Sequence, residues 1–253
     1  MSSRFGMRFK GILAFDGTGF QGWQTQQLGQ SIQEHVESVF SQILNQSIKV
    51  HGASRTDAGV HAEGFVFHFD AETSLTATRI RRGFNRLVHT QLVLRSLQRV
   101  SSSFESRFSY SKKTYRYQIY IGERNPFLSR YAHYYFAPLD ISLFRHTLKL
   151  FVGEHCFQNF TVKPEDDIAF VRTLYSITVK VEENLLLVTL VGSGFMTHMI
   201  RMIVGTALAV QEGKLTRLQL TNLLDPNTPR QPVSFKAPPH GLYLQRIQYA
   251  KTR

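Results

Sequence analysis

The sequence predicts a protein of the α+β class, with two similar units that each pack helices on one face of a mainly antiparallel, mixed sheet. Three observations support this fold class. Segments with strand periodicity and segments with helix periodicity follow one another in mixed order through both halves of the chain. The 253 residues are enough for two domains with hydrophobic cores. A hydrophobic content of 42% is too high for a disordered basic chain.

In the first half, apolar residues alternate with polar ones from Met7 to Phe15, which predicts a half-buried strand. Ser31 and Glu34 form a capping box, and the apolar residues that follow recur at helical spacing, so a helix is expected to begin at Ser31. The remaining elements of this half are expected in the order strand, strand, helix, strand, at residues 48–53, 65–69, 78–87 and 91–100.

In the second half, Tyr115, Tyr117 and Ile119 share one face of a strand expected over 114–121. The further elements are a strand at 131–136, a helix at 141–151, strands at 171–181 and 185–191, helices at 196–210 and after Thr216, and a last strand at 242–248. This order is similar to that of ferredoxin-like and RRM-like units, whose sheets can join into one extended sheet. We expect domains at residues 1–105 and 106–253.

The net charge of +12, from 30 basic and 18 acidic side chains, indicates a polyanionic partner, either a nucleic acid or an acidic membrane surface. Residues 1–105 carry 11 basic and 8 acidic side chains, whereas residues 106–253 carry 19 and 10. Because neither half contains a long run of lysine or arginine, the charge is expected on folded elements rather than on a tail. The alternative is a basic protein that binds no anion.

The single cysteine, Cys156, can form no internal disulfide, which favours a reducing compartment. The N-terminal residues lack the features of a secretion signal, and the longest apolar tract meets His198 and Arg201 before it could span a bilayer. We therefore expect a cytoplasmic protein. The ten histidines show no tight ligand spacing, so no metal site is expected.

Residues 17–22 read Gly-Thr-Gly-Phe-Gln-Gly after a strand and match the dinucleotide-binding pattern GxGxxG. In that fold the last glycine lies in the first turn of a helix, whose N-terminus faces the pyrophosphate. Here residues 23–29 intervene before the capping box at Ser31, so the helix comes too late. We expect the loop to place Phe20, Trp23 and several amide side chains along a surface instead.

The segment GASRTDAGVHA, residues 52–62, places one acid, Asp57, close to one base, Arg55, in a loop between two strands. A carboxylate in such a loop can act as a nucleophile or as a general base. The plainer interpretation is a tight turn in which Asp57 bonds a backbone N–H and Gly59 adopts a positive φ. Composition alone leaves both interpretations open.

Two further segments favour a nucleic-acid site. In KTYRY, residues 113–117, aromatic and cationic side chains are expected on opposite faces of one strand, where they could stack a base and meet phosphates; core tyrosines opposite solvated cations are the alternative. Arg201 lies in an otherwise apolar helix and needs an anionic partner, for which Asp57 is the best candidate. Thr197, Arg201 and Gly205 share a narrow helix face that another group can approach closely.

The segments FDGTGFQGWQ, RTDAGVHA, KTYRY, GFMTHMIRMIVG and APPHGLYL occur in the order and approximate spacing of the TruA-type tRNA pseudouridine synthases, which the chain resembles over nearly its whole length. The resemblance implies isomerisation of uridine to pseudouridine at positions 38 to 40 in the tRNA anticodon arm. It also implies a homodimer of two-domain α+β subunits that needs no cofactor or metal. Phe15, Phe20 and Cys156 depart from the family pattern but lie outside the proposed catalytic positions.

The resemblance implies a role for several residues. Asp57 corresponds to the catalytic aspartate, Tyr115 to the aromatic residue that packs on the target base, and Arg201 to the basic partner of the aspartate. Arg55 corresponds to the arginine that helps to flip the base. Cations on phosphates are expected to supply most of the affinity. The predicted tRNA track consists of Arg79, Arg81, Arg82, Arg86, Lys112, Lys113 and Arg116.

Two other function classes stay open on the sequence alone. One is a catalytically silent RNA-binding protein on the same scaffold, and the other is a dinucleotide-dependent oxidoreductase. The presence of Asp57, Tyr115 and Arg201 disfavours the first, because a silent protein has no chemical reason to keep a buried pair of Asp57 and Arg201. The late helix disfavours the second. For the arginines of the predicted track, an ordinary solvated helix face is the alternative.

Overall fold

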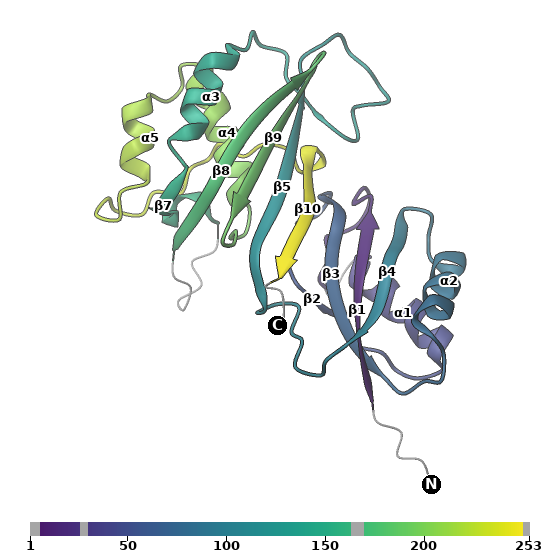
Figure 1. Cartoon of the computed structure of the whole chain (residues 1–253). Helices are drawn as coiled ribbons and strands as arrows, with labels where there is room; N and C mark the ends of the chain where they lie inside the picture. The colour runs from purple at the N-terminus through teal and green to yellow at the C-terminus, as the bar shows by residue number, and fades with distance from the viewer. Residues whose placement is uncertain (1–5, 26–29, 163–169, 250–253) are drawn as a thin grey trace. The chain divides into compact units, whose positions relative to one another are not determined.

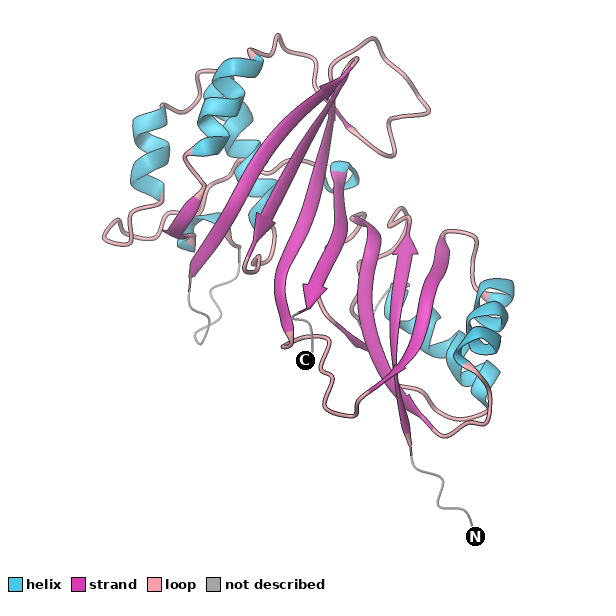
Figure 2. Ribbon diagram, in the orientation of Figure 1, coloured by secondary structure: helices cyan, strands magenta, loops and turns pink. Residues whose placement is uncertain are grey.

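The computed structural model describes residues 6–25, 30–162 and 170–249. The chain forms two compact units: the first comprises Met1–Ser111 and Leu244–Arg253, and the second comprises Lys112–Tyr243. Each unit combines a mostly antiparallel sheet with helices that lie on one face of that sheet (Figures 1 and 2). The predicted α+β fold class is confirmed.

The strands of the first unit are β1 (Met7–Phe15), β2 (His51–Gly52), β3 (His61–Ala71), β4 (Leu92–Val100) and β10 (Leu242–Tyr249). Their order in the sheet is β4-β1-β3-β10, with β2 beside β3. β1 runs antiparallel to both β3 and β4. A Cβ atom on Gly11 would lie 2.2 Å from the ring of Phe67, so glycine is needed for this ring to lie across β1.

The helices α1 (Ile32–Leu44) and α2 (Ala77–Leu87) enclose an aromatic core against this sheet. The ring of Phe40 lies 4.5 Å from that of Phe69 and 4.7 Å from that of Phe84. All three side chains are fully buried, and burying each contributes about 1.5–3 kcal/mol. The capping box predicted for Ser31 and Glu34 is present at the start of α1.

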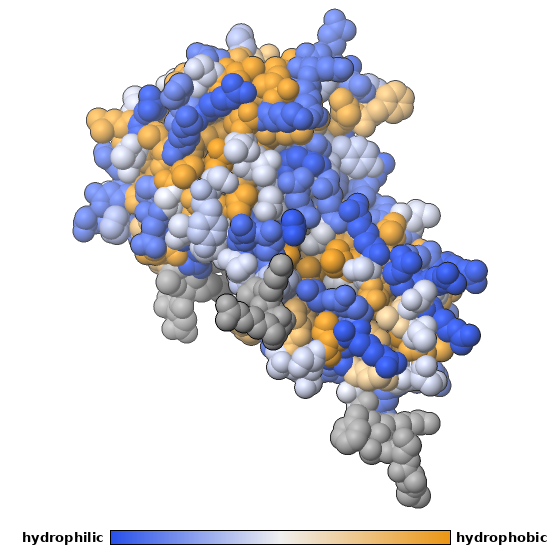
Figure 3. Space-filling model, viewed as in Figure 1, coloured by the Kyte–Doolittle hydropathy of each residue, from blue (hydrophilic) through white to orange (hydrophobic). Residues whose placement is uncertain are grey.

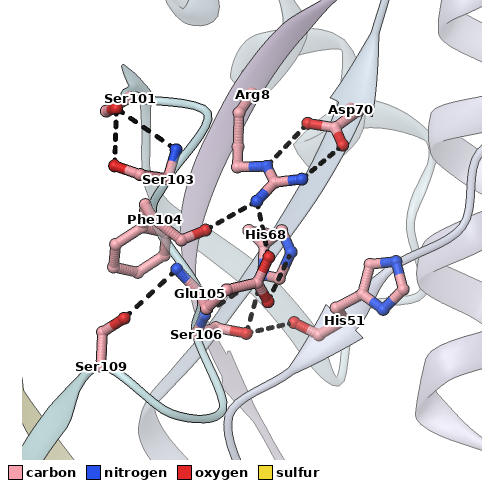
Figure 4. A network of polar contacts seen from close by, with 10 residues as sticks. All are labelled: Arg8, His51, His68, Asp70, Ser101, Ser103, Phe104, Glu105, Ser106 and Ser109. Atoms are coloured by element: carbon pink, nitrogen blue, oxygen red, sulfur yellow. Dashed lines mark hydrogen bonds and ion pairs between the residues drawn. The ribbon is translucent and has the colours of Figure 1, made fainter.

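The chain that follows β4 is fastened to the first unit by a polar network (Figure 4). Arg8 donates to both carboxylate oxygens of Asp70, at 2.8 and 2.7 Å, and to Glu105 at 2.7 Å. These hydrogen bonds from the guanidinium hold the pKa of the Asp70 carboxyl below its usual value. The Ser106 hydroxyl lies 2.9 Å from Nδ1 of buried His68. These contacts fix the path of the backbone at Glu105 and Ser106, after β4.

The second unit contains β5 (Tyr110–Tyr120), β6 (His133–Tyr134), β7 (Gly153–Cys156), β8 (Val171–Glu182) and β9 (Leu185–Gly192). Their order is β5-β9-β8-β7, and β6 pairs with β5 in parallel. The helices are α3 (Ile141–Lys149), α4 (Met199–Gln211) and α5 (Arg217–Leu223), with single 3-10 turns at Gln158–Phe160 and Pro239–Gly241. Almost every residue of α4 is buried, which agrees with its apolar sequence.

The strand expected over 48–53 is shorter than predicted, because only β2 pairs with its neighbour. The backbone N–H of Ile48 donates to the Ser41 hydroxyl at 3.0 Å, and that of Val50 donates to the Glu37 carboxylate at 3.0 Å. Side chains of α1 thus take the hydrogen bonds that a longer strand would have used.

The second unit also differs from expectation, in the start of one helix and in an additional strand. The helix expected from residue 196 begins at Met199, because His198 has a φ of 63° and cannot continue a right-handed helix. The strand β7 was not predicted, since four residues are too few for a recognisable period. Within the described ranges, no helix is long and apolar enough to cross a membrane.

Candidate active site

Asp57 lies in the tight turn that joins β2 to β3. Its backbone carbonyl accepts a hydrogen bond from the N–H of Val60 at 3.2 Å, and Gly59 has a φ of 75°. Asp57 is half-buried, Arg55 is exposed, and Thr56 is buried. The tight turn is therefore present, with Gly59 at a positive φ. Its backbone fixes the position from which the Asp57 side chain extends.

The glycine-rich loop that precedes α1 supports this turn. The N–H of Trp23 donates to the carbonyl of Thr56 at 3.2 Å, and the N–H of Gly59 donates to the carbonyl of Phe20 at 3.3 Å. These two bonds lie on opposite sides of Asp57 in the sequence. The backbone of the turn is thus held at both ends by one neighbouring loop.

The glycine-rich loop differs in part from the prediction. The late start of α1, after Ser31, is confirmed, so the GxGxxG pattern does not open a helix. However, Phe20 and Trp23 are only 6% and 3% exposed and do not line a surface. The indole of Trp23 stacks on the ring of Phe65 at 4.0 Å, because large rings gain more from burial than from exposure. Residues 26–29 of this loop lie outside the described ones.

On β5, Tyr115 and Tyr117 share the buried face of the strand. Tyr115 is 6% exposed, and its ring meets that of Phe195 edge-on at 5.2 Å. The expectation that all cations lie on the opposite face is wrong for Lys113, which is buried on the same face as Tyr115 because the two are two positions apart along the strand. Arg116 does point the other way, and its guanidinium lies 5.2 Å from the ring of Tyr243.

Arg201 is buried within α4 and bonded to a distant part of the second unit. Its Nε donates to the carbonyl of Ala237 at 2.9 Å, and its own carbonyl accepts from the N–H of Ala237 at 2.9 Å. A Cβ atom on Gly205 would lie 2.8 Å from the carbonyl carbon of Phe235. The predicted close approach is therefore present at Arg201 and Gly205, where the approaching group is the chain itself, whereas Thr197 precedes the helix and does not share this face.

Tyr117 lies beside this arrangement and differs chemically from Tyr115. Its hydroxyl donates to the carbonyl of Pro238 at 2.8 Å. Burial raises the pKa of Tyr117 far above its usual value, although the positive charge of Arg201 acts in the opposite direction. Tyr117 therefore holds the loop that Arg201 contacts through this hydrogen bond.

The exposed face of α2 carries three arginines at helical spacing, Arg79, Arg82 and Arg86. The helix contains no acidic residue, and the surface over it is strongly hydrophilic (Figure 3). Arg81 points differently, because its Nη1 donates to the carbonyl of Arg95 at 3.3 Å. The three exposed side chains form a basic stripe, which we call the α2 arginine stripe.

The predicted residues fall into two groups. Arg55, Asp57 and the α2 arginine stripe belong to the first unit, and Tyr115 and Arg201 belong to the second, as do Lys113 and Arg116. The pairing of Asp57 with Arg201 stays a prediction. Across the described parts of the chain, no group of three or more histidine, cysteine, aspartate or glutamate side chains could hold a metal ion.

Sequence reasoning did not identify two residues that contact Tyr115 and Arg201. Phe195 is the second residue of the GFMTHMIRMIVG segment and precedes α4, and only its contact with Tyr115 distinguishes it from a core residue. Ala237, at the start of the APPHGLYL segment, acts through its backbone, which no side-chain pattern reveals. Pro238 and Pro239, which follow it, could have indicated a backbone segment of fixed conformation, because proline restricts the φ angle.

A family model described as tRNA pseudouridine synthase matches residues 148–250. Proteins named tRNA pseudouridine synthase A from Geobacillus sp. (strain WCH70) and Anoxybacillus flavithermus are each 37% identical to this chain over 244 residues, which is 96% of this chain and 98% of either relative. The chain belongs to the tRNA pseudouridine synthase A family. It is an isomerase that converts uridine in tRNA to pseudouridine, as the resemblance implied.

Other members of the tRNA pseudouridine synthase A family are similarly related. The protein of that name from Streptococcus uberis is 35% identical over 246 residues, or 96% of this chain and 98% of the relative. Among solved structures, an H/ACA RNP bound to a substrate RNA containing 2'-deoxyuridine aligns with 79% of this chain at 14% identity and a TM-score of 0.39. This chain spans 43% of the length of that chain.

Proposed function

We propose that this tRNA pseudouridine synthase acts at positions 38 to 40 of the anticodon arm, with Asp57 as its essential carboxylate. The observation that carries the proposal is the turn at Asp57, whose backbone is bonded at both ends within the RTDAGVHA motif. A reacting carboxylate must be held in place, because a displacement of 1 Å can lower a rate on the order of 100-fold. The turn supplies that constraint.

The isomerisation breaks the glycosidic bond between the ribose and a ring nitrogen, rotates the uracil, and rejoins it through a ring carbon. Nothing is oxidised, and no water is consumed. An ionised Asp57 can attack the nucleoside as a nucleophile, or it can remove a proton to start elimination of uracil. After the new carbon–carbon bond has formed, the proton on that ring carbon must leave. Tyr115 is the candidate that accepts or relays it, because the hydroxyl of Tyr117 already donates to the carbonyl of Pro238.

The target base would have to leave its stack, which costs about a few kcal/mol. Arg55 is exposed in the same turn as Asp57 and could occupy the space that the base leaves. Tyr115, with Phe195 against its ring, would pack on the freed uracil. Arg201 would act as the cationic partner of Asp57. These roles follow from the family resemblance together with the geometry of each unit.

Position-specific mapping tests the proposed site of modification. Incubation of the enzyme with unmodified tRNA transcripts is expected to place pseudouridine at positions 38 to 40, detected as carbodiimide-dependent stops in reverse transcription. Transcripts in which these uridines are replaced by cytidine serve as the control and should show no new stop. Pseudouridine that forms only outside the anticodon arm would contradict the proposed site while leaving the family activity intact.

We infer that the α2 arginine stripe binds tRNA phosphates, together with Arg116, whereas the predicted contact through Lys113 is disfavoured because that side chain is buried. Replacing the three arginines of the stripe by glutamine should weaken tRNA binding, because each phosphate contact releases counterions. The slope of log affinity against log salt concentration is negative and should become less steep by about 2 to 3 units. Dissociation constants measured over a salt series check this. Arg145→Gln, on α3, is the control and should leave the slope unchanged. An unchanged slope in the triple variant would identify the stripe as an ordinary solvated face.

We also infer that the enzyme acts as a homodimer in the cytoplasm, as the resemblance implies. A two-fold dimer would repeat the basic surface of one subunit on the other. One subunit could then hold the body of the tRNA while the other acts on the anticodon arm. The surplus of basic over acidic side chains in the chain supports binding to an extended polyanion.

A further inference from the structure

Asp16 and His61 form a contact at the base of the turn that carries Asp57. Asp16 directly follows β1, and His61 is the first residue of β3. The His61 side chain is 2% exposed, and its Nδ1 lies 3.1 Å from Oδ1 of Asp16. The same Nδ1 accepts a hydrogen bond from the N–H of Gly17 at 3.1 Å, while Oδ1 of Asp16 accepts from the N–H of Thr18 at 2.9 Å. This pair therefore fixes the start of the glycine-rich loop.

Two glycines of that loop touch the backbone of the Asp57 turn. A Cβ atom on Gly17 would lie 2.1 Å from the carbonyl oxygen of Val60, and one on Gly22 would lie 2.4 Å from that of Thr56. Gly22 also has a φ of 85°, which L side chains rarely adopt. Thr56 and Val60 lie on either side of Asp57, so any movement of the loop is passed to the turn through these two carbonyls.

We propose that Asp16, His61 and Gly22 are positioning residues that hold the Asp57 carboxylate in place for the isomerisation, an inference that rests on the proposed role of Asp57. His61 accepts a hydrogen bond from the backbone N–H of Gly17. The loop that starts there contacts the Asp57 turn at Gly17 and again at Gly22. The GxGxxG pattern thus has a structural explanation that involves no nucleotide. Gly17 and Gly22 allow two backbones to approach more closely than any Cβ atom permits, whereas Gly19 has a positive φ of 81° and nothing within 4 Å of its Cβ position.

The choice of His61 variants separates positioning from general stability. In His61→Asn, the side-chain amide occupies nearly the place of Nδ1, so its oxygen can still accept the hydrogen bond from the N–H of Gly17. In His61→Gln, the amide lies one carbon farther out and cannot accept that hydrogen bond without moving the loop. We expect kcat of His61→Gln to fall on the order of tenfold or more, with an unchanged KM for tRNA, and we expect His61→Asn to recover most of that loss.

Gly22→Ala tests the backbone contact directly. The added methyl group would meet the carbonyl of Thr56, and kcat is expected to fall on the order of 100-fold while the dissociation constant for tRNA stays within about twofold. Gly213→Ala is the matched control, because Gly213 also has a positive φ, of 69°, but nothing lies within 4 Å of the position of its Cβ atom. That variant carries the same kind of backbone strain and should keep the wild-type kcat.

The outcomes distinguish this inference from the proposed function. If His61→Gln and Gly22→Ala both keep the wild-type kcat while Asp57→Asn is inactive, the positioning role is wrong and the role of Asp57 stands. Equal losses of kcat and thermal stability in His61→Asn and His61→Gln would show a merely structural contact and would also overturn the proposal. An active Asp57→Asn variant would instead contradict the proposed function. Should Gly22→Ala fail to fold, the two His61 variants still decide the question.

Discussion

Replacing Asp57 by asparagine is expected to abolish pseudouridine formation while leaving the affinity for tRNA within about tenfold of the wild type. The amide has nearly the shape of the carboxylate, so the turn between β2 and β3 should persist. It carries no negative charge, however, and can act neither as the nucleophile nor as the base that the isomerisation needs. The loss should therefore appear in kcat rather than in binding.

Single-turnover release of tritium from the target ring carbon measures this effect, and filter binding measures the affinity. Glu72→Gln provides the matched control in the same unit, because this exposed residue contacts Gln46 through its backbone rather than through its carboxylate. It should turn over at the wild-type rate. If the Asp57→Asn variant turned over at that rate as well, another carboxylate would have to carry the reaction.

Replacing Arg201 by methionine is expected to lower both activity and stability. Methionine fills a similar volume in α4 but leaves the carbonyl of Ala237 without the donor that Nε supplies. An unsatisfied buried acceptor costs about 1–3 kcal/mol, which should appear as a lower free energy of unfolding. The loss of the proposed partner of Asp57 should lower kcat on the order of 100-fold, as for other charge-stabilising groups.

Denaturant unfolding and single-turnover kinetics check the two effects separately. Arg201→Lys retains the positive charge but not the geometry of the guanidinium, so it should recover part of the activity and less of the stability. Wild-type activity in Arg201→Met would mean that Asp57 has a different partner. Equal activity in the lysine and methionine variants would show that the charge of residue 201 plays no part in the reaction.

The elements that depend on local signals could be predicted from the sequence. The capping box at Ser31 places the start of α1, and the alternation in Met7–Phe15 defines β1 to the residue. Thr216 likewise caps α5, as its position in the sequence predicts. In each case the hydrogen bonds or the buried face arise within a few residues of one another. Tertiary structure had little to add to these predictions.

The features that depend on distant contacts could not be predicted. The backbone of Ile48 and Val50 bonds to side chains of α1, which no local pattern reveals. Similarly, the contact between Asp16 and His61 joins two strands that are far apart in the sequence. The candidate site was located because its residues belong to recognisable motifs. The supports beneath it are backbone atoms and glycines, whose role shows only when the chain is folded.

Both units depend on residues near the end of the chain. The first takes its strand β10 from residues that follow the whole of the second unit, and Arg201 takes its hydrogen-bond partner from Ala237. During synthesis, the first unit therefore emerges from the ribosome before the strand that completes its sheet, and Arg201 emerges before Ala237. Domains otherwise tend to fold in order from the N-terminus. In this enzyme the sheet of the first unit can be completed only after the second unit has been synthesised.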